Sequence, residues 1–400
     1  MSWRSTRLAA FCACSMLPAC GVETSPSETS MAAVETSGDG DGDGDGDSGD
    51  GEPGDGDGEP GDGDGEPGDG DGEPGDGDGD GETGFGPWCG APPACDAAPP
   101  APGPELSWEH FDSNVIALAG DPQHRVRDMF YVPGETQWLM GKFTYGTFDK
   151  DLKDERVDVY VMRNCAGPWE FMGEAWTTEE GAHATIEGVE DTGGWVYLEI
   201  PPDQQLDFGR HRVHMVVRGD QTTTDGFIEV VEPGTPIFLS DIDGTLTTFE
   251  TEEFVDLLAG VTPMANQFAA TALSTLQDKG YHAMYLTARP EFLVQRSREF
   301  IAERGFPPGI IHTSLFLEGA LGDAAVAYKT GELAMLMGKG LIPTYVFGNT
   351  DSDAEAYDNA GIMPLDHRVL FQFTDPWGGR RIESYGELVP EYSALADLCD

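Results

Sequence analysis

The pattern of apolar and polar positions changes character twice along the chain. From residue 105 to 233, short runs alternate apolar and polar residues with period two, as strands with one buried face do. Turn residues separate these runs at regular intervals, which predicts a β-sandwich in this part of the chain. The clearest runs are Arg156–Met162, Gly194–Ile200, Arg212–Val217 and Phe227–Val231.

From residue 234 to 400 the pattern switches to strands that alternate with helices. Uncharged or nearly uncharged runs suit buried parallel strands, and stretches with helical spacing separate them. Such alternation predicts an α/β domain with a Rossmann-like parallel sheet. The predicted strands are Pro236–Leu239, Tyr281–Pro290, Gly309–Phe316 and Tyr345–Gly348.

One short helical segment and three helices are expected between these strands. Phe249–Leu258 forms a short amphipathic segment, and Thr262 with Pro263 is typical of a helix start. The helix that follows is expected to end at Gly280 and to bury an apolar stripe. A second helix runs from Pro290 to Gly305, and a third carries Lys329. The stripe consists of Met264, Phe268, Ala272, Leu273 and Leu276.

The front of the chain has no pattern that could build a core. Residues 1–20 combine a basic start, a short apolar run and small residues, which predicts a secretory signal. Residues 21–104 are dominated by Gly, Asp, Glu and Pro and predict a disordered acidic tether. The run Leu17–Cys20 resembles the lipobox of bacterial lipoproteins. The resemblance implies lipidation of Cys20, export, and an anchor in the outer membrane that faces the periplasm or the cell surface.

The net charge limits the possible binding partners, and the cysteine count limits the possible disulfides. The formal net charge is −51 and there is no basic patch, so nucleic-acid binding is disfavoured. Four cysteines remain beyond the predicted lipid site: Cys89, Cys95, Cys165 and Cys399. An even number in an exported protein allows two disulfides. Cys89 and Cys95 can close a small loop at the end of the tether, although sequence leaves the pairing open.

The polar residues with the clearest chemistry follow the predicted strands. Asp241 and Asp243 end the first strand, and alternate residues of an extended segment point the same way. Ligands bind at the carboxyl edge of open parallel sheets. Mg²⁺ accepts one or two carboxylates together with a substrate phosphate. The pair therefore indicates a cation and phosphoryl site, with an ordinary acidic turn as the alternative.

Four motifs follow one another in the α/β region: Ser240–Thr247, Tyr285–Pro290, Ala327–Glu332 and Gly348–Asp353. Together they resemble the haloacid dehalogenase superfamily. Within it they resemble the catalytic domain of lipin-type phosphatidate phosphatases and the related domain of phosphatidylinositol-transfer proteins. The resemblance covers about residues 236 to 373. It implies a haloacid dehalogenase fold with a minimal cap, because the motif spacing leaves no room for a large one.

The sandwich ahead of this region is expected to be immunoglobulin-like or transthyretin-like.

The resemblance also implies roles for four catalytic residues. Asp241 would be the nucleophile that forms an aspartyl-phosphate, and Asp243 would protonate the leaving alcohol and then activate water. Thr287 would donate a hydrogen bond to the phosphoryl group. Lys329 would supply positive charge to the nucleophile and the transferring phosphate.

The same resemblance implies Mg²⁺ as cofactor. Its expected ligands are the Asp241 carboxylate, the Asp243 backbone carbonyl and the motif that contains Asn349 and Asp353. Asp351 is an additional carboxylate that can substitute as a ligand.

Two functions follow from these predictions. The first is a Mg²⁺-dependent phosphomonoester hydrolase acting on phosphatidate or another phosphate ester near a membrane. The alternative is a non-catalytic module that binds phosphatidate or another lipid, or a surface adhesin with a vestigial phosphatase domain. The retained Asp241 favours the enzyme over a domain that has lost its nucleophile.

Overall fold

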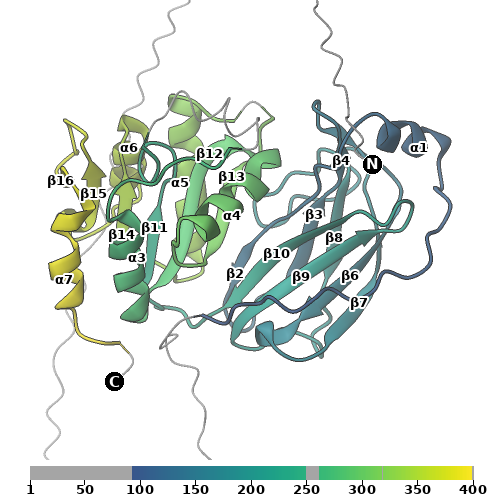
Figure 1. The fold of residues 1–400 in the computed structure, drawn as a ribbon, viewed down its shortest axis with the longest axis horizontal. Coiled ribbons are helices and arrows are strands. Elements are labelled where there is room, and N and C mark those ends of the chain that lie inside the picture. The colour runs from purple at the N-terminus through teal and green to yellow at the C-terminus, as the bar shows by residue number, and fades with distance from the viewer. Residues whose placement is uncertain (1–91, 249–260, 318, 399–400) are drawn as a thin grey trace, which may run out of the picture. The chain divides into compact units, whose positions relative to one another are not determined.

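The computed structural model describes residues 92–248, 261–317 and 319–398, which lie within one compact unit (Figure 1). The predicted signal with Cys20, most of the predicted tether, and the amphipathic segment expected at Phe249–Leu258 lie outside these ranges. Within the described ranges, no helix combines the length and the apolar character that crossing a membrane requires.

The first domain is built from two β-sheets. One has the strand order β1-β3-β8 and the other the order β2-β10-β9-β6-β7. Neighbouring strands pair antiparallel, except β2 and β10, which are parallel. A short hairpin of β4 and β5 stands apart, and helix α1 (Phe111–Leu118) precedes the strands. The strands are β1 (Arg125–Val126), β2 (Met129–Tyr131), β3 (Trp138–Lys142), β4 (Thr144–Tyr145), β5 (Lys150–Asp151), β6 (Arg156–Met162), β7 (Trp169–Trp176), β8 (Trp195–Glu199), β9 (Gly209–Val217) and β10 (Thr223–Val230), with the 3-10 turn η1 (Arg163–Cys165) after β6.

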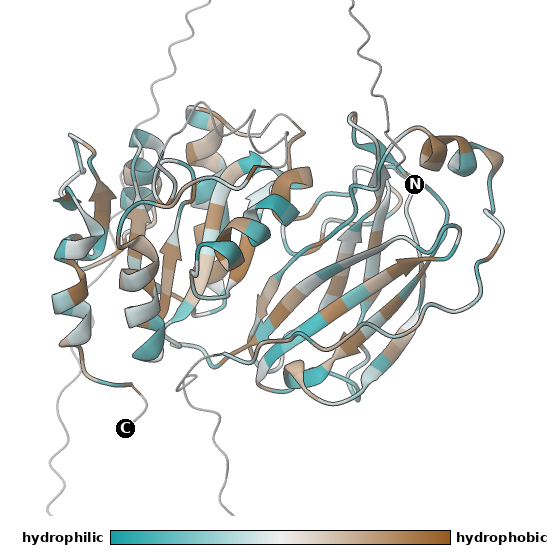
Figure 2. Ribbon diagram, viewed as in Figure 1, coloured by the Kyte–Doolittle hydropathy of each residue, from teal (hydrophilic) through white to brown (hydrophobic). Residues whose placement is uncertain are grey.

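The apolar positions of the period-two runs meet between the two sheets. Val157, Val159 and Val161 of β6 are fully buried and belong to one core cluster with Leu139 of β3 and Trp195 of β8. Because these side chains come from both sheets, the strands form the predicted β-sandwich. Bands of apolar residues along its strands are visible in Figure 2.

The second domain is a six-stranded sheet with helices packed on it. Its strand order is β13-β12-β11-β14-β15-β16 and every neighbouring pair is parallel. The parallel α/β architecture is confirmed. The strands are β11 (Ile237–Ser240), β12 (His282–Pro290), β13 (Ile310–Ser314), β14 (Pro343–Gly348), β15 (Arg368–Phe371) and β16 (Arg380–Ile382). The helices are α3 (Ala269–Asp278), η2 (Glu291–Leu293), α4 (Val294–Glu303), α5 (Asp323–Gly338), α6 (Asp351–Asn359), η3 (Leu365–His367), η4 (Tyr385–Glu387) and α7 (Val389–Ser393).

Strand β11 is buried on both faces. Phe238 joins the cluster that contains residues of α3, α4 and α7, whereas Ile237 and Leu239 join the cluster that contains residues of α5 and α6. Successive side chains of a strand point to opposite faces, so the uncharged run suits a strand covered by helices on both sides. This burial fixes where β11 ends and thus where Asp241 lies.

The predicted start of the first helix is wrong. Helix α3 begins at Ala269, after Phe268 adopts a left-handed backbone with φ 65°. The backbone carbonyls of Thr262 and Pro263 accept hydrogen bonds from Arg304, and Met264 is 64% exposed. Pro263 therefore belongs to a loop that hydrogen bonds from Arg304 hold in place. The later part of the predicted stripe is buried as expected: Ala272, Leu273 and Leu276.

The pairing of Cys95 with Cys89 needs correction, because Cys95 forms a disulfide with Cys165.

The polar turn between β4 and β5 is held by Arg125. The carboxylate of Asp149 accepts two hydrogen bonds from this arginine, at 2.6 and 2.7 Å. Arg125 also bonds to Glu291 of the α/β domain at 3.1 Å. The polar turn is thus linked to the second domain.

Candidate functional site

The aspartates at the end of β11 lie at the carboxyl edge of the sheet. The backbone of Asp241 continues the ladder by donating to the carbonyl of Phe347, at 2.9 Å. Its side chain is buried, with 3% of the residue exposed, and Asp243 is partly exposed. Gly244 has φ 70°, a left-handed conformation that suits glycine and turns the chain away from the edge.

Lys329 of helix α5 joins two carboxylates inside this edge. Its Nζ lies 2.9 Å from Asp241 Oδ1 and 2.5 Å from Asp353 Oδ1. All three side chains are almost fully buried. The other oxygen of Asp241 accepts a hydrogen bond from Thr245 at 3.0 Å. The structure therefore brings together residues that are separated by 88 and 24 positions in the sequence.

The charges in this cluster do not balance. Burial raises the pKa of Asp241 to about 7; Lys329 opposes that rise, and Asp353 and Asp243 add to it. Burial alone would lower the pKa of Lys329, but the carboxylates of Asp241 and Asp353 outweigh burial and raise it above the ordinary lysine value. One lysine thus faces an excess of negative charge, and an additional cation would relieve that excess.

Asp243 is held by a separate set of donors. The Thr287 hydroxyl donates to Asp243 Oδ2 at 2.8 Å, and Arg289 Nε donates to Oδ1 at 2.8 Å. Arg289 also donates to the Ser297 hydroxyl, at 3.1 Å. Through these contacts Arg289 connects Asp243 to helix α4. Thr287 lies at the edge as predicted, with its hydroxyl directed to Asp243.

The fourth motif points one of its two aspartates inward. Asp353 is fully buried, and its Oδ2 accepts from the backbone N–H groups of Asn349 and Thr350, each at 3.1 Å. Asn349 Oδ1 accepts a hydrogen bond from Thr245 at 2.7 Å. Asp351 is exposed and accepts a hydrogen bond from Trp377 instead. Asp353, rather than Asp351, therefore occupies the position expected of a metal ligand.

The donor set fits a hard divalent cation. Asp241 and Asp353 supply two buried carboxylates that share one lysine, and oxygen ligands are those that Mg²⁺ prefers. Within the described ranges, no three His, Cys, Asp or Glu side chains gather as a metal site. The predicted set takes a backbone carbonyl from Asp243 and two carboxylate side chains, and it remains a prediction.

Two contributors to the site were not among the predicted site residues. Thr245 connects Asp241 to Asn349, and Thr350 caps helix α6 while it donates to Asp353 at 2.8 Å. Both stand inside the motifs: Thr245 is two positions after Asp243, and Thr350 directly follows Asn349. Their position in the sequence could have identified them as site residues, because a hydroxyl beside a buried carboxylate commonly donates a hydrogen bond to it.

Both domains are similar to domains of known proteins. Residues 122–230 match the family model described as the β-sandwich domain of PITM 1-3, and residues 238–369 match the LNS2 domain of PITM 1-3. These domains are related to the lipin and haloacid dehalogenase-like phosphatases.

Curated relatives cover the same part of the chain. Protein retinal degeneration B of Drosophila melanogaster is 30% identical over 262 residues, which are 65% of this chain and 19% of that protein. Human membrane-associated phosphatidylinositol transfer protein 2 is 26% identical over 269 residues, 67% of this chain and 18% of that protein. The chain thus spans about a fifth of the length of these relatives.

Proposed function

We propose that the α/β domain binds the phosphate group of a phospholipid of the phosphatidate class at the carboxyl edge of its sheet. The observation that carries this proposal is the buried cluster in which Lys329 joins Asp241 and Asp353. A phosphomonoester brings further negative charge, so it requires the lysine and a bound cation together. Mg²⁺ would be held by Asp241, Asp353 and the Asp243 carbonyl and would neutralise charge on the phosphate.

The relatives support a lipid as the partner. Their names describe membrane-associated transfer of phosphatidylinositol, and their similarity to this chain extends over both domains. A lipid on Cys20 and the acidic tether would keep the domain close to a membrane surface. Binding alone requires no chemistry at Asp241.

Sedimentation with vesicles tests the binding. We expect the protein to sediment with phosphatidylcholine vesicles that contain phosphatidate, in Mg²⁺ and not in EDTA. Lys329→Met should weaken binding at least about tenfold, since the site loses a charged contact of roughly 1.4 kcal/mol or more. Lys339→Met is the matched control, because Lys339 follows the same helix and pairs with Glu135 instead. Equal binding by wild type and Lys329→Met would refute the proposal.

Hydrolysis of the same phosphate is a second candidate function. The observation that favours it is the intact Asp241, with one carboxylate oxygen on Lys329 and the other on Thr245. Asp243 stands two residues further on and is oriented by Thr287 and Arg289. Asp241 and Asp243 would thus serve as nucleophile and acid–base group, the roles that the haloacid dehalogenase resemblance implies.

The chemistry would proceed in two steps. An oxygen of Asp241 attacks phosphorus, the bond from phosphorus to the alcohol oxygen breaks, and Asp243 gives that oxygen a proton. Asp243, now a carboxylate, takes a proton from water that attacks the aspartyl-phosphate. Inorganic phosphate leaves, and Asp241 and Asp243 return to their starting states. Lys329 stabilises the negative charge throughout.

Phosphate release separates the two candidates. Wild type is expected to release phosphate from phosphatidate and from an aryl phosphate in Mg²⁺. Asp241→Asn should reduce release by about 10³-fold or more, as loss of a nucleophile does. Asp351→Asn serves as the control, because its carboxylate is exposed and faces Trp377. Vesicle binding without any release by wild type would leave the binding function alone.

A further inference from the structure

Large apolar side chains stand exposed in the loop that connects β13 to α5. Phe316 is 59% exposed, Leu317 is 54% exposed and Leu321 is 87% exposed. Strand β13 is parallel to β11, so this loop leaves the sheet at the edge that carries Asp241. Ala320 of the loop donates to the carbonyl of Ala288, which follows Thr287 directly. The exposed side chains are therefore neighbours of the candidate site.

A second group of exposed apolar residues lies at the turn that carries Asp243. Val261 is 53% exposed and Met264 is 64% exposed. Thr248 donates to the carbonyl of Met264, and Asn266 donates to the carbonyls of Thr245 and Thr247. These contacts attach the segment to the turn after β11.

The β4–β5 hairpin of the sandwich is the third segment with an exposed apolar side chain. Phe148 lies in its turn and is 87% exposed. Its neighbour Asp149 lines a cavity of about 310 Å³ together with Phe316 and Leu317. The hairpin thus reaches the loop between β13 and α5. We call Val261, Met264, Phe148, Phe316, Leu317 and Leu321 the apolar rim.

Single exposed apolar residues are common on proteins, so the position of the rim carries the argument. Its members come from three separate segments and lie beside an edge where the chain holds a buried lysine and carboxylates. Ile342 offers a contrast. It is 56% exposed, but it precedes β14 and thus lies at the amino end of the sheet, away from the site.

We infer that the apolar rim inserts into the headgroup and acyl boundary of a phospholipid bilayer; this inference rests on the proposed function. A bilayer offers phosphate groups directly above hydrocarbon, which matches a phosphate site beside exposed apolar side chains. The chain carries a net charge of −51, so general attraction to an anionic surface does not hold it there. Apolar contact therefore contributes binding free energy that long-range electrostatic attraction does not supply.

The first measurement is vesicle sedimentation with Phe316→Ser/Leu321→Ser. In Mg²⁺, this double variant is expected to bind at least tenfold more weakly than wild type to phosphatidylcholine vesicles that contain phosphatidate. Ile342→Ser is the matched control and should bind like wild type. Full binding by the double variant, or an equal loss with Ile342→Ser, would overturn the inference. Any hydrolysis of a soluble aryl phosphate should be unaffected by both.

The second measurement detects insertion directly. Leu321→Trp is expected to show quenching of the added tryptophan by brominated phosphatidylcholine, relative to wild type, and Ile342→Trp is not. Lys329→Met tests the phosphate site separately. If Lys329→Met binds phosphatidate vesicles normally while Leu321→Trp is quenched, the phosphate proposal fails and the rim stands. Absence of quenching in Leu321→Trp, or absence of any vesicle binding by wild type, refutes the inference that the apolar rim inserts into a bilayer.

Discussion

Two buried carboxylates in the α/β domain experience opposite environments. Asp241 and Glu332 are 3% and 4% exposed. The pKa of Asp241 is raised to about 7, whereas that of Glu332 is lowered to about 2. Burial opposes ionisation of both, so their partners account for the difference.

The partners of Glu332 are all basic. Burial would raise the pKa of Glu332, but Arg127 and His312 outweigh burial and lower it. Arg127 Nη2 lies 2.6 Å from one carboxylate oxygen, and His312 Nδ1 lies 2.5 Å from the other. Asp241, in contrast, shares Lys329 with Asp353. One cluster is satisfied by the chain itself, and the other is short of positive charge.

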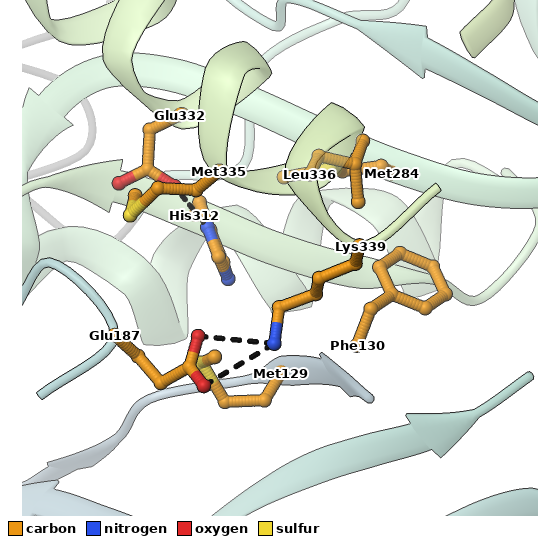
Figure 3. A pocket seen from close by; sticks show the side chains of 9 residues that line it. All are labelled: Met129, Phe130, Glu187, Met284, His312, Glu332, Met335, Leu336 and Lys339. Atoms are coloured by element: carbon orange, nitrogen blue, oxygen red, sulfur yellow. Dashed lines mark hydrogen bonds and ion pairs between the residues drawn. The ribbon is translucent and has the colours of Figure 1, made fainter. Parts of the chain in front are cut away.

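The difference distinguishes a structural cluster, around Glu332, from the candidate site around Asp241. Arg127 belongs to the sandwich and Glu332 to helix α5, so their contact holds the two domains together. Figure 3 shows Glu332 beside His312, and Glu187 of the sandwich directed at Lys339. The cavity between these residues has a volume of about 20 Å³, close to that of a single water position. Lys329 lies one helical turn before Glu332, so the sandwich fixes the helix that supplies the site's lysine.

The largest expected effect comes from the satisfied cluster. Arg127→Met leaves Glu332 buried without its guanidinium partner, and the loss of one member of a buried pair costs about 3–5 kcal/mol. Urea unfolding followed by circular dichroism should show this decrease in the free energy of unfolding. Arg163→Met is the control: its pair with Glu170 is partly exposed, so it should cost about 1 kcal/mol or less. Equal effects of the two variants would contradict the comparison.

Acid should remove the same stabilisation. The folded pKa of Glu332 lies below its ordinary value of 4.5, so its contribution is complete above pH 4.5 and is lost as the pH falls toward 2. Glu332→Gln lacks this titration. Wild type should exceed Glu332→Gln by on the order of 3 kcal/mol above pH 4.5, and the gap should close near pH 2. Urea unfolding across this range measures the gap; a constant gap would refute the assignment.

The sequence predicts the carboxyl edge better than it predicts the domain interface. Asp241 follows β11, Thr287 lies in the carboxyl half of β12, and Asp353 lies in the first turn of α6, shortly after β14. Each belongs to a local motif, so their meeting follows from parallel strand order. Arg127 and Glu332 are 205 positions apart, and nothing in the pattern around Arg127 distinguishes it from a surface arginine. Such contacts depend on how two finished domains pack, which local pattern does not encode.

The fold was predicted where burial follows a simple period. The valines of β6 recur with period two and are buried, β11 is buried throughout, and the limits of both strands agree with the predicted runs to within one residue. Strands β15 and β16 were missed because they are four and three residues long, and three of their residues are arginines. The start of α3 was misplaced because Asn266 and Arg304 fix the loop by contacts with distant carbonyls. Local propensity was overridden there by tertiary contacts.

A smaller effect of opposite sign is expected in the unbalanced cluster. Asp241→Asn leaves Lys329 paired with Asp353 alone, so the excess of buried negative charge falls. In EDTA we expect this variant to be more stable than wild type by about 1–3 kcal/mol, as substitutions at functional sites often are. Glu332→Gln, a matched loss of one carboxylate, should be less stable. A decrease in stability with both variants would remove the distinction between the clusters.

Binding of Mg²⁺ gives a second test of the difference between the Asp241 and Glu332 clusters. Addition of Mg²⁺ should raise the unfolding temperature of wild type and of Glu332→Gln, because both keep the ligands of the site. Asp241→Asn should show little change, since it lacks one carboxylate of the predicted set. Thermal unfolding with Mg²⁺ and with EDTA measures this shift. An equal shift in all three proteins would place the cation elsewhere.

The smallest effect concerns the cap that orients Asp353. Thr350 accepts a hydrogen bond from the backbone of Asp353 at 3.4 Å and donates to its carboxylate at 2.8 Å. Thr350→Ala removes both contacts and should cost about 1 kcal/mol, the usual cost of a lost helix cap. Thr350→Ser retains a hydroxyl and should restore most of that stability. Because Asp353 Oδ2 keeps two backbone donors, Thr350→Ala should weaken Mg²⁺ binding only slightly; loss of the magnesium shift in this variant would show that the hydroxyl, rather than the backbone, positions the ligand.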